Sequence, residues 1–133
     1  DLLGAEKIYL VLVNLKSKNA VAYNNLAWVL DKLKKSGALV YAEKANELMP
    51  NQPAFMDTLA SIYASTGSFD KAVNLQTKVL AIDPKNMAYK LNLAKIHIMS
   101  GKKDLARKQL EELRLLGESF PAHAEVAALL SRV

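Results

Sequence analysis

The same sequence pattern recurs along the chain at steps of 33 and then 34 residues, and this recurrence limits the possible folds more than any other feature. The segments AYNNLAWVL (22–30), FMDTLASIY (55–63) and YKLNLAKIH (89–97) align so that a Leu-Ala pair falls in shared columns. A second column holds small residues, at Ala5, Ala38, Ala72 and Ala106. A unit of this length cannot bury its apolar face alone. We therefore expect the units to stack side by side into an elongated array.

Each unit predicts two helices and no strand. In the middle unit, apolar residues recur at helical spacing from 59 to 63 and again from 69 to 82, and Gly67 between the two runs predicts a helix end. Pro50 and Pro84 predict the ends of the second helices. The predicted helices cover 3–16, 20–33, 38–49, 53–65, 69–82, 87–99, 103–116 and 121–131.

The first unit is one residue shorter than the others. It has Lys34 in the column of Gly67 and Gly101, and its own glycine follows three residues later. We therefore place the missing residue in the turn of the first repeat, between Leu30 and Ala38.

Together, the period, the Leu-Ala pairs, the small-residue columns and the two prolines resemble the tetratricopeptide repeat family. The resemblance covers essentially the whole chain and implies an all-α, right-handed superhelix of antiparallel helix pairs, with about eight helices. We interpret residues 1–133 as one solenoid fragment: 1–19 as the second helix of a preceding repeat, 20–52, 53–86 and 87–120 as three repeats, and 121–133 as a closing helix. A piece of a longer array would have this organisation.

Three segments carry a narrower resemblance. The motifs Asn24-Asn25-Leu26-Ala27-Trp28 and Asp57-Thr58-Leu59-Ala60, with the tail from Phe120-Pro121 to Leu130, are similar to the C-terminal region of the PEP-CTERM-system tetratricopeptide lipoproteins. Those are bacterial proteins associated with exosortase and exopolysaccharide gene clusters. The sequence departs from them at Ala60-Ser61, where Gly-Trp is expected. The resemblance implies an exported or outer-membrane-anchored scaffold whose lipid anchor lies outside this fragment; the alternative is a cytoplasmic protein.

Sites for catalysis, metals or cofactors are not expected. The chain has no cysteine, which excludes disulfides, thiolate metal sites and a cysteine nucleophile. The two histidines, His97 and His123, are 26 residues apart and lack metal-binding spacing. We expect His97 to be a core residue bonded to a neighbour and His123 to be solvated. Neither a nucleophile elbow nor a phosphate-binding loop is present.

In the tetratricopeptide repeat family, the first helix of each repeat lines a concave groove that binds a peptide or partner helix. The resemblance therefore implies a groove formed by polar residues and one tryptophan, at Asn24, Asn25, Trp28, Asp57, Thr58, Ser61, Asn92 and Lys95. Asparagine amides can both donate to and accept from a peptide backbone, and Asn25 and Asn92 would be rungs of such a ladder, with Thr58 between them. The paired Lys, Asn and Arg that clamp a chaperone tail are missing. The alternatives are ordinary polar residues on a solvated face and a Trp28 packed against its neighbouring helix.

A basic edge is the second candidate surface. The net charge is +5, and the predicted turns within repeats carry Lys34, Lys35, Lys71, Lys102 and Lys103. Such an edge could meet an acidic protein or an anionic polysaccharide, and the alternative is a solvated face. Nucleic acid is not expected, because no stacking aromatics alternate with the lysines.

Two functions from different classes follow. The first is a non-catalytic interaction scaffold with a protein or peptide partner; the second is a purely structural segment that terminates a long array, with binding upstream. For the closing helix, we expect Val126, Ala127 and Leu130 to cover the last repeat and His123, Glu125 and Arg132 to face water. At the other end, Ile8, Leu12 and Leu15 should form an exposed apolar patch that favours self-association.

Overall fold

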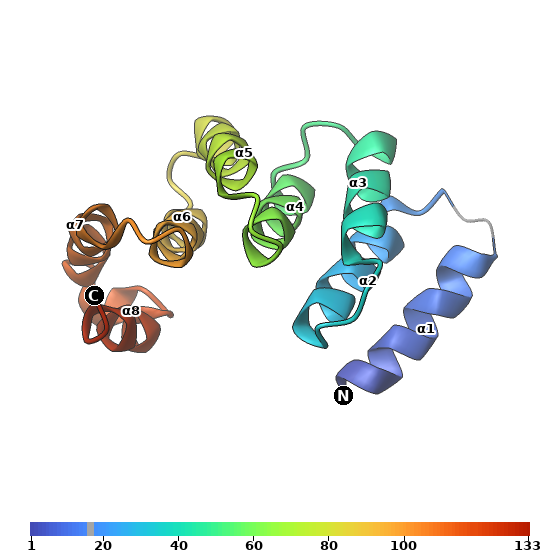
Figure 1. Ribbon diagram of the computed structural model, residues 1–133, viewed down its shortest axis with the longest axis horizontal. Coiled ribbons are helices and arrows are strands. Elements are labelled where there is room, and N and C mark those ends of the chain that lie inside the picture. Colours follow the sequence, from blue (N-terminus) through green and yellow to red (C-terminus); the bar gives the residue numbers. More distant parts are fainter. Residues whose placement is uncertain (16–17) are drawn as a thin grey trace.

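The computed structural model describes residues 1–15 and 18–133, and within these ranges it contains eight α-helices, one 3-10 helix and no strand (Figure 1). The helices are α1 (Leu2–Asn14), α2 (Ala20–Lys32), α3 (Ala38–Leu48), α4 (Pro53–Ser65), α5 (Phe69–Ile82), α6 (Met87–Met99), α7 (Lys103–Arg114), η1 (Gly117–Ser119) and α8 (His123–Leu130). All eight predicted helices are confirmed, and their described ends differ from the prediction by two residues at most. Position 16, the predicted end of the first helix, lies outside the described residues.

The helices stack in two rows along an arc (Figure 1). The inner row contains α2, α4, α6 and α8, and the outer row contains α3, α5 and α7. Each helix contacts the next along the chain, and α2 also contacts α4, as α4 contacts α6. The fold is therefore an all-α solenoid, and its inner row presents the first helix of each predicted repeat.

Alanines at the helix seams allow this close stacking. Ala27, Ala60 and Ala94 are completely buried, as are Ala72 and Ala106 in the second small-residue column. A methyl group lets the facing helix approach closely, whereas a larger side chain would force the two helices apart. The buried apolar residues consequently form several clusters spread along the stack.

The end of the first helix in each repeat has the same backbone geometry despite different residues. Gly67 and Gly101 have φ angles of 86° and 83°, and Lys34 adopts the same left-handed region at 56°. In all three repeats, the amide of the following residue donates to the carbonyl five positions earlier, as in the bond from Ser68 N to Tyr63 O at 2.8 Å. The first repeat therefore keeps the helix stop with a side chain that is strained in this conformation.

The prediction that the shorter first repeat loses its residue from the turn was wrong, because the residue is lost from a helix. The connection 33–37 has five residues, compared with three in 66–68 and 100–102. Helix α3 begins at Ala38, whereas α5 begins three residues before the equivalent Ala72. The first turn of α3 is thus absent, and Gly37, with φ 94°, precedes the helix instead.

The closing helix packs largely as expected. Val126 and Leu129 are buried with Phe120 against Leu110 and Leu113 of α7, and Leu130 packs at the edge of this cluster. The prediction for Ala127 was wrong, because this residue is exposed. The buried face of α8 is formed by Val126, Leu129 and Leu130, at positions i, i+3 and i+4, and Ala127 lies about 100° around the helix from Val126. His123, Glu125 and Arg132 are exposed, as predicted.

The shared helix stop predicts opposite effects for two substitutions. Gly67→Ala should lower the free energy of unfolding by about 1–2 kcal/mol, because a Cβ is unfavourable at positive φ. Lys34→Gly should raise it by up to about 1 kcal/mol, because relief of strain exceeds the entropy cost of glycine. Urea unfolding of the two variants measures both effects. Equal stability of Gly67→Ala and the unsubstituted chain would contradict this account.

Candidate functional site

A pocket lies between α1 and α2 at the N-terminal end of the inner row. Its volume is about 460 Å³, and its lining includes Tyr9 of α1 with Asn24, Asn25 and Trp28 of α2. Residue 28 lies four positions after residue 24 and three after residue 25, so its side chain neighbours both on the helix surface. The structure thus brings together three of the predicted groove residues, all from the first repeat.

The polar groups in this pocket are held differently. The Asn25 side-chain amide donates to Tyr9 Oη at 3.2 Å, which links α2 to α1. The Asn24 Oδ1 atom is buried and has no hydrogen-bond partner among the described residues. A buried acceptor without a donor is costly, so a donor that reached this oxygen after a turn of the Asn24 side chain would be favoured.

Trp28 forms an open wall of the pocket. Its side chain is 47% exposed, and Lys32 Nζ lies 5.5 Å from the centroid of its ring. A cation at this distance from an indole face interacts favourably with the ring. Of the two alternatives for Trp28, the structure shows a half-exposed ring and not one buried against a neighbouring helix.

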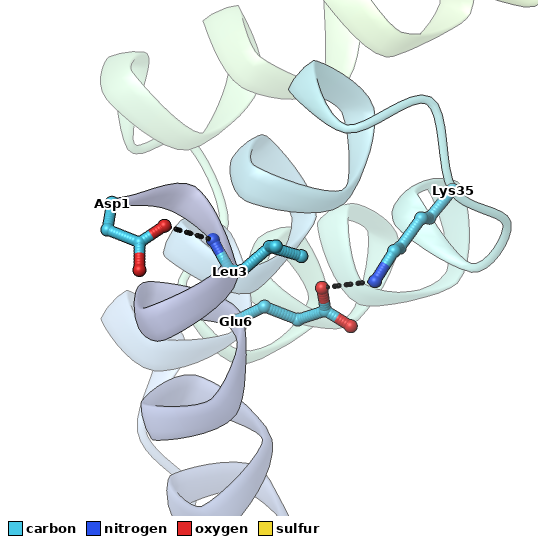
Figure 2. Close-up of polar contacts among 4 residues, drawn as sticks. All are labelled: Asp1, Leu3, Glu6 and Lys35. Carbon is cyan, nitrogen blue, oxygen red and sulfur yellow. Dashed lines mark hydrogen bonds and ion pairs between the residues drawn. The ribbon is translucent and has the colours of Figure 1, made fainter.

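Figure 2 shows how α1 is held beside α2. Lys35, in the connection after α2, donates to Glu6 of α1 at 2.6 Å. At the start of α1, Asp1 Oδ1 accepts a hydrogen bond from Leu3 N at 3.1 Å and caps the helix. These contacts position the α1 side of the pocket.

A second polar cluster joins the next two repeats. Asp57 of α4 accepts hydrogen bonds from Gln76 of α5 at 2.8 Å and from Asn92 of α6 at 2.9 Å and 3.1 Å. Gln76 is completely buried and also donates to Tyr89 O at 3.0 Å. Asp57 and Asn92 therefore bind each other, and the Asn92 amide nitrogen is engaged by the carboxylate in this conformation.

Burial is the main influence on the Asp57 carboxyl. Desolvation raises its pKa above the usual 3.8, while hydrogen bonds from Asn92 and Gln76 and the charge of Lys95 act in the opposite direction. The direction shows that removing the carboxylate from water outweighs these partners.

The remaining groove candidates divide between buried and paired residues. The Thr58 hydroxyl donates to Ala54 O in its own helix at 3.1 Å, and Thr58 is buried. In this conformation the members of the expected ladder, Asn25, Thr58 and Asn92, each have a different intramolecular partner. Lys95 forms an ion pair with Glu125 of α8, and Ser61 is half-buried.

Two residues of these clusters were not among the predicted site residues. Tyr9 and Gln76 occupy one repeat column, whose other members are Ala42 and Leu110. The repeat spacing could have aligned this column. However, the four residues in this column differ chemically, so the column does not indicate that any of them makes a polar contact between repeats.

The predicted basic edge is partly neutralised. Lys35 is paired with Glu6, and Lys34 lines a surface cavity with Ser65 and Thr66. Lys71 Nζ lies 5.6 Å from the centroid of the Tyr63 ring. Lys102 and Lys103 are exposed at the third turn. The lysines are accessible, but at least one of the five has a carboxylate partner.

Both histidines have structural roles. His97 is buried, and its Nδ1 lies 2.9 Å from Gln109 Oε1, which confirms the predicted core histidine. His123 is exposed, as expected, with Nδ1 at 3.0 Å from Phe120 O. Among residues 1–15 and 18–133, no group of three or more His, Asp or Glu side chains is arranged to hold a metal ion.

Stacked helix pairs with a polar inner row define an α-solenoid repeat protein. A family model for the tetratricopeptide repeat matches residues 67–133. The chain belongs to the tetratricopeptide repeat family, whose members generally mediate protein–protein interactions and are typically non-enzymatic scaffolds. No curated protein matches the chain. In the described part of the chain, no helix has the length and apolar character needed to cross a membrane.

The raised pKa of the Asp57 carboxyl predicts how the stability of the fold changes with pH. Because its folded pKa is raised above the unfolded value of 3.8, this group stabilises the fold most at low pH. That contribution is lost as pH rises from about 3.8 through the raised pKa. Asp57→Asn should therefore become more stable relative to the unsubstituted chain across this window.

Urea unfolding at a series of pH values measures the difference in stability. Asp70→Asn, a change at an exposed carboxyl in the first turn of α5, is the control for the removal of one surface charge. A pH-independent difference for Asp57→Asn would disprove the assignment.

Proposed function

We propose that this chain is a non-catalytic interaction scaffold that binds an extended peptide or a partner helix at the pocket of Asn24, Asn25 and Trp28. The observation that carries the proposal is the half-exposed Trp28 ring beside the buried, unpartnered Asn24 Oδ1. Large rigid aromatic residues dominate the energetics of many protein interfaces. Trp28 would supply apolar contact area, and Asn24 Oδ1 would accept a hydrogen bond from a peptide N–H.

The inner row beyond this pocket would contribute shape more than polar contacts. Asp57 and Asn92 are engaged with each other, and Lys95 with Glu125. A partner that uses these groups would have to replace existing hydrogen bonds. We therefore place the main binding energy at the first repeat and assign Ser61 a contact role at the margin.

The finer proposal is that the scaffold is part of a longer exported bacterial lipoprotein linked to exopolysaccharide or protein-sorting machinery. Its support is the resemblance at Asn24-Asn25-Leu26-Ala27-Trp28 and in the C-terminal tail. Exposed lysines at the repeat turns, such as Lys71 and Lys102, would suit an anionic polysaccharide. A lipoprotein signal sequence with its cysteine, encoded upstream in the full gene, would support this proposal. A full-length gene product without an export signal, found in the cytoplasm, would reject it.

A second candidate function is structural. The α8 residues Val126 and Leu129 are buried against α7, while His123 and Glu125 of α8, and Arg132 just after it, are exposed. A polar outer face is what a terminal repeat of a solenoid requires for solubility. In this interpretation the chain terminates an array and binds no peptide itself.

Self-association is a further proposal, based on α1. Ile8 and Leu15 are 62% and 72% exposed, and Val11 and Leu12 are exposed beside them. An apolar face of this kind favours a contact between two copies, because burial removes it from water.

Peptide binding can be tested through the only tryptophan in the chain. Peptides selected from a random display library should shift the Trp28 fluorescence when they bind. Trp28→Ala should weaken their affinity, measured by calorimetry, at least tenfold, or about 1.4 kcal/mol. Asn24→Ala should weaken it by a smaller factor.

The matched control is Met99→Ala, a change at an exposed apolar residue on α6. If a selected peptide binds Trp28→Ala and the unsubstituted chain with equal affinity, the binding site lies elsewhere. If no peptide binds the unsubstituted chain, the structural function is preferred.

Self-association can be tested by sedimentation equilibrium. The unsubstituted chain should dimerise at high concentration, and Ile8→Lys with Leu15→Lys should remain monomeric because the charges oppose burial. Val40→Lys with Leu115→Lys is the control, since both residues are exposed apolar residues outside α1. A monomer at all concentrations would count against the contact.

A further inference from the structure

A cavity of about 360 Å³ lies between α5, α6 and α7, apart from the groove pocket. Five of its lining residues are apolar: Leu80, Met87, Leu93, Leu113 and Leu116. The exposed residues Lys90 and Glu112 also border it. At 100° per residue, Lys90 lies on the side of α6 opposite Asn92 and Lys95, which belong to the predicted groove. The cavity is therefore separate from the site proposed above.

The repeat alignment shows what fills the equivalent space in the first two repeats. Two columns are involved, and their members are Tyr23, Met56 and Lys90 in the first and Tyr41, Leu75 and Gln109 in the second. In the first repeat, the rings of Tyr23 and Tyr41 stack with centroids 6.0 Å apart. In the second repeat, Met56 is buried and Leu75 packs against the core. Tyr23 also packs against Ala20 and Ala45, the counterparts of Met87 and Leu113. An aromatic or apolar side chain thus covers the seam in both repeats, although Tyr23 and Tyr41 themselves border a surface cavity with Glu43 and Lys44.

The third repeat lacks both fillers. Lys90 is exposed, because its ammonium group must remain in water. Gln109 turns to His97, with Oε1 at 2.9 Å from Nδ1, and this contact satisfies the buried imidazole. A histidine in the core therefore requires a polar residue at a position where the other repeats have an apolar or aromatic one.

The leucine at the base of the cavity is also less covered than its counterparts in the other repeats. In the Leu-Ala columns, Leu26 is 0% exposed and Leu59 is 8% exposed, whereas Leu93 is only partly buried. The cavity volume also falls in the range typical of ligand pockets, ~300–1,000 Å³. An apolar surface of this shape gains free energy when an apolar group covers it.

We propose that this cavity is a docking pocket for one methionine or aromatic side chain of a partner protein. The occupant is identified by the chain itself, because methionine and tyrosine fill the equivalent space in the other repeats. The partner would supply from outside the side chain that the third repeat lacks. A partner could then engage the solenoid on a second face while the groove binds another segment.

The test uses N-acetyl-methionine amide and N-acetyl-phenylalanine amide as probes, with N-acetyl-serine amide as the polar control. Each is titrated into the full chain with ¹³C-labelled leucine methyl groups. The two apolar probes should cause saturable shifts at Leu80, Leu93 and Leu113, with dissociation constants in the millimolar range or below. The serine probe should cause none.

Lys90→Met reproduces the second repeat and should fill the cavity with its own side chain. It should weaken both apolar probes at least tenfold. Lys103→Met, which removes the same charge from an exposed position at the start of α7, should leave the affinities unchanged. Trp28→Ala should also leave them unchanged, which separates this pocket from the groove.

Several results would overturn the proposal: no saturable shifts, equal shifts with the serine probe, or unchanged affinity in Lys90→Met. Shifts of the same leucines that depend on protein concentration without a probe would identify a second copy as the occupant and would also overturn it.

Discussion

The close approach of helices at completely buried alanines is the contact on which the other features depend. Ala27, Ala60 and Ala94 bring each inner helix against its paired helix, and Ala72 and Ala106 do so from the other side. Because the separation of the helices is set by these methyl groups, larger side chains in neighbouring columns must fill a space of nearly constant size. Groove, cavity and cap are all consequences of how each repeat fills that space.

Helix number and position could be predicted because they depend on properties that repeat with the sequence. Small residues at the seams, left-handed helix stops and prolines recur at fixed steps, and each has a local physical cause. Even the exception at Lys34 follows this logic, since the backbone there retains the left-handed geometry of Gly67. The loss of the first turn of α3 could not be predicted, because a missing residue can be absorbed by either the turn or the helix.

The candidate site was less predictable because polar side chains choose partners across repeats. Asn25, Thr58 and Asn92 occupy one column, yet they bind Tyr9 Oη, Ala54 O and Asp57 respectively. The partners of Asn25 and Asn92 lie in other helices and do not repeat, whereas Thr58 bonds to a carbonyl of its own helix. The shared column correctly predicts that the three side chains lie at equivalent positions on their helices. The hydrogen-bond partner of each side chain depends on the residues around it. Asp57 shows the consequence, since burial raises its pKa despite two amide donors.

The contacts of this solenoid also determine how it can come apart. The principal contacts join helices no more than two places apart in the row. Folding and unfolding can therefore proceed as a sequence of local steps along the stack, with each step limited by one seam. Helix α1 has a single buried residue, Val13, which is fewer than any other α-helix of the described chain, so fraying should start there. Because α1 forms one wall of the Trp28 pocket, opening of that end would alter this pocket while α6, α7 and the cavity between them stay folded.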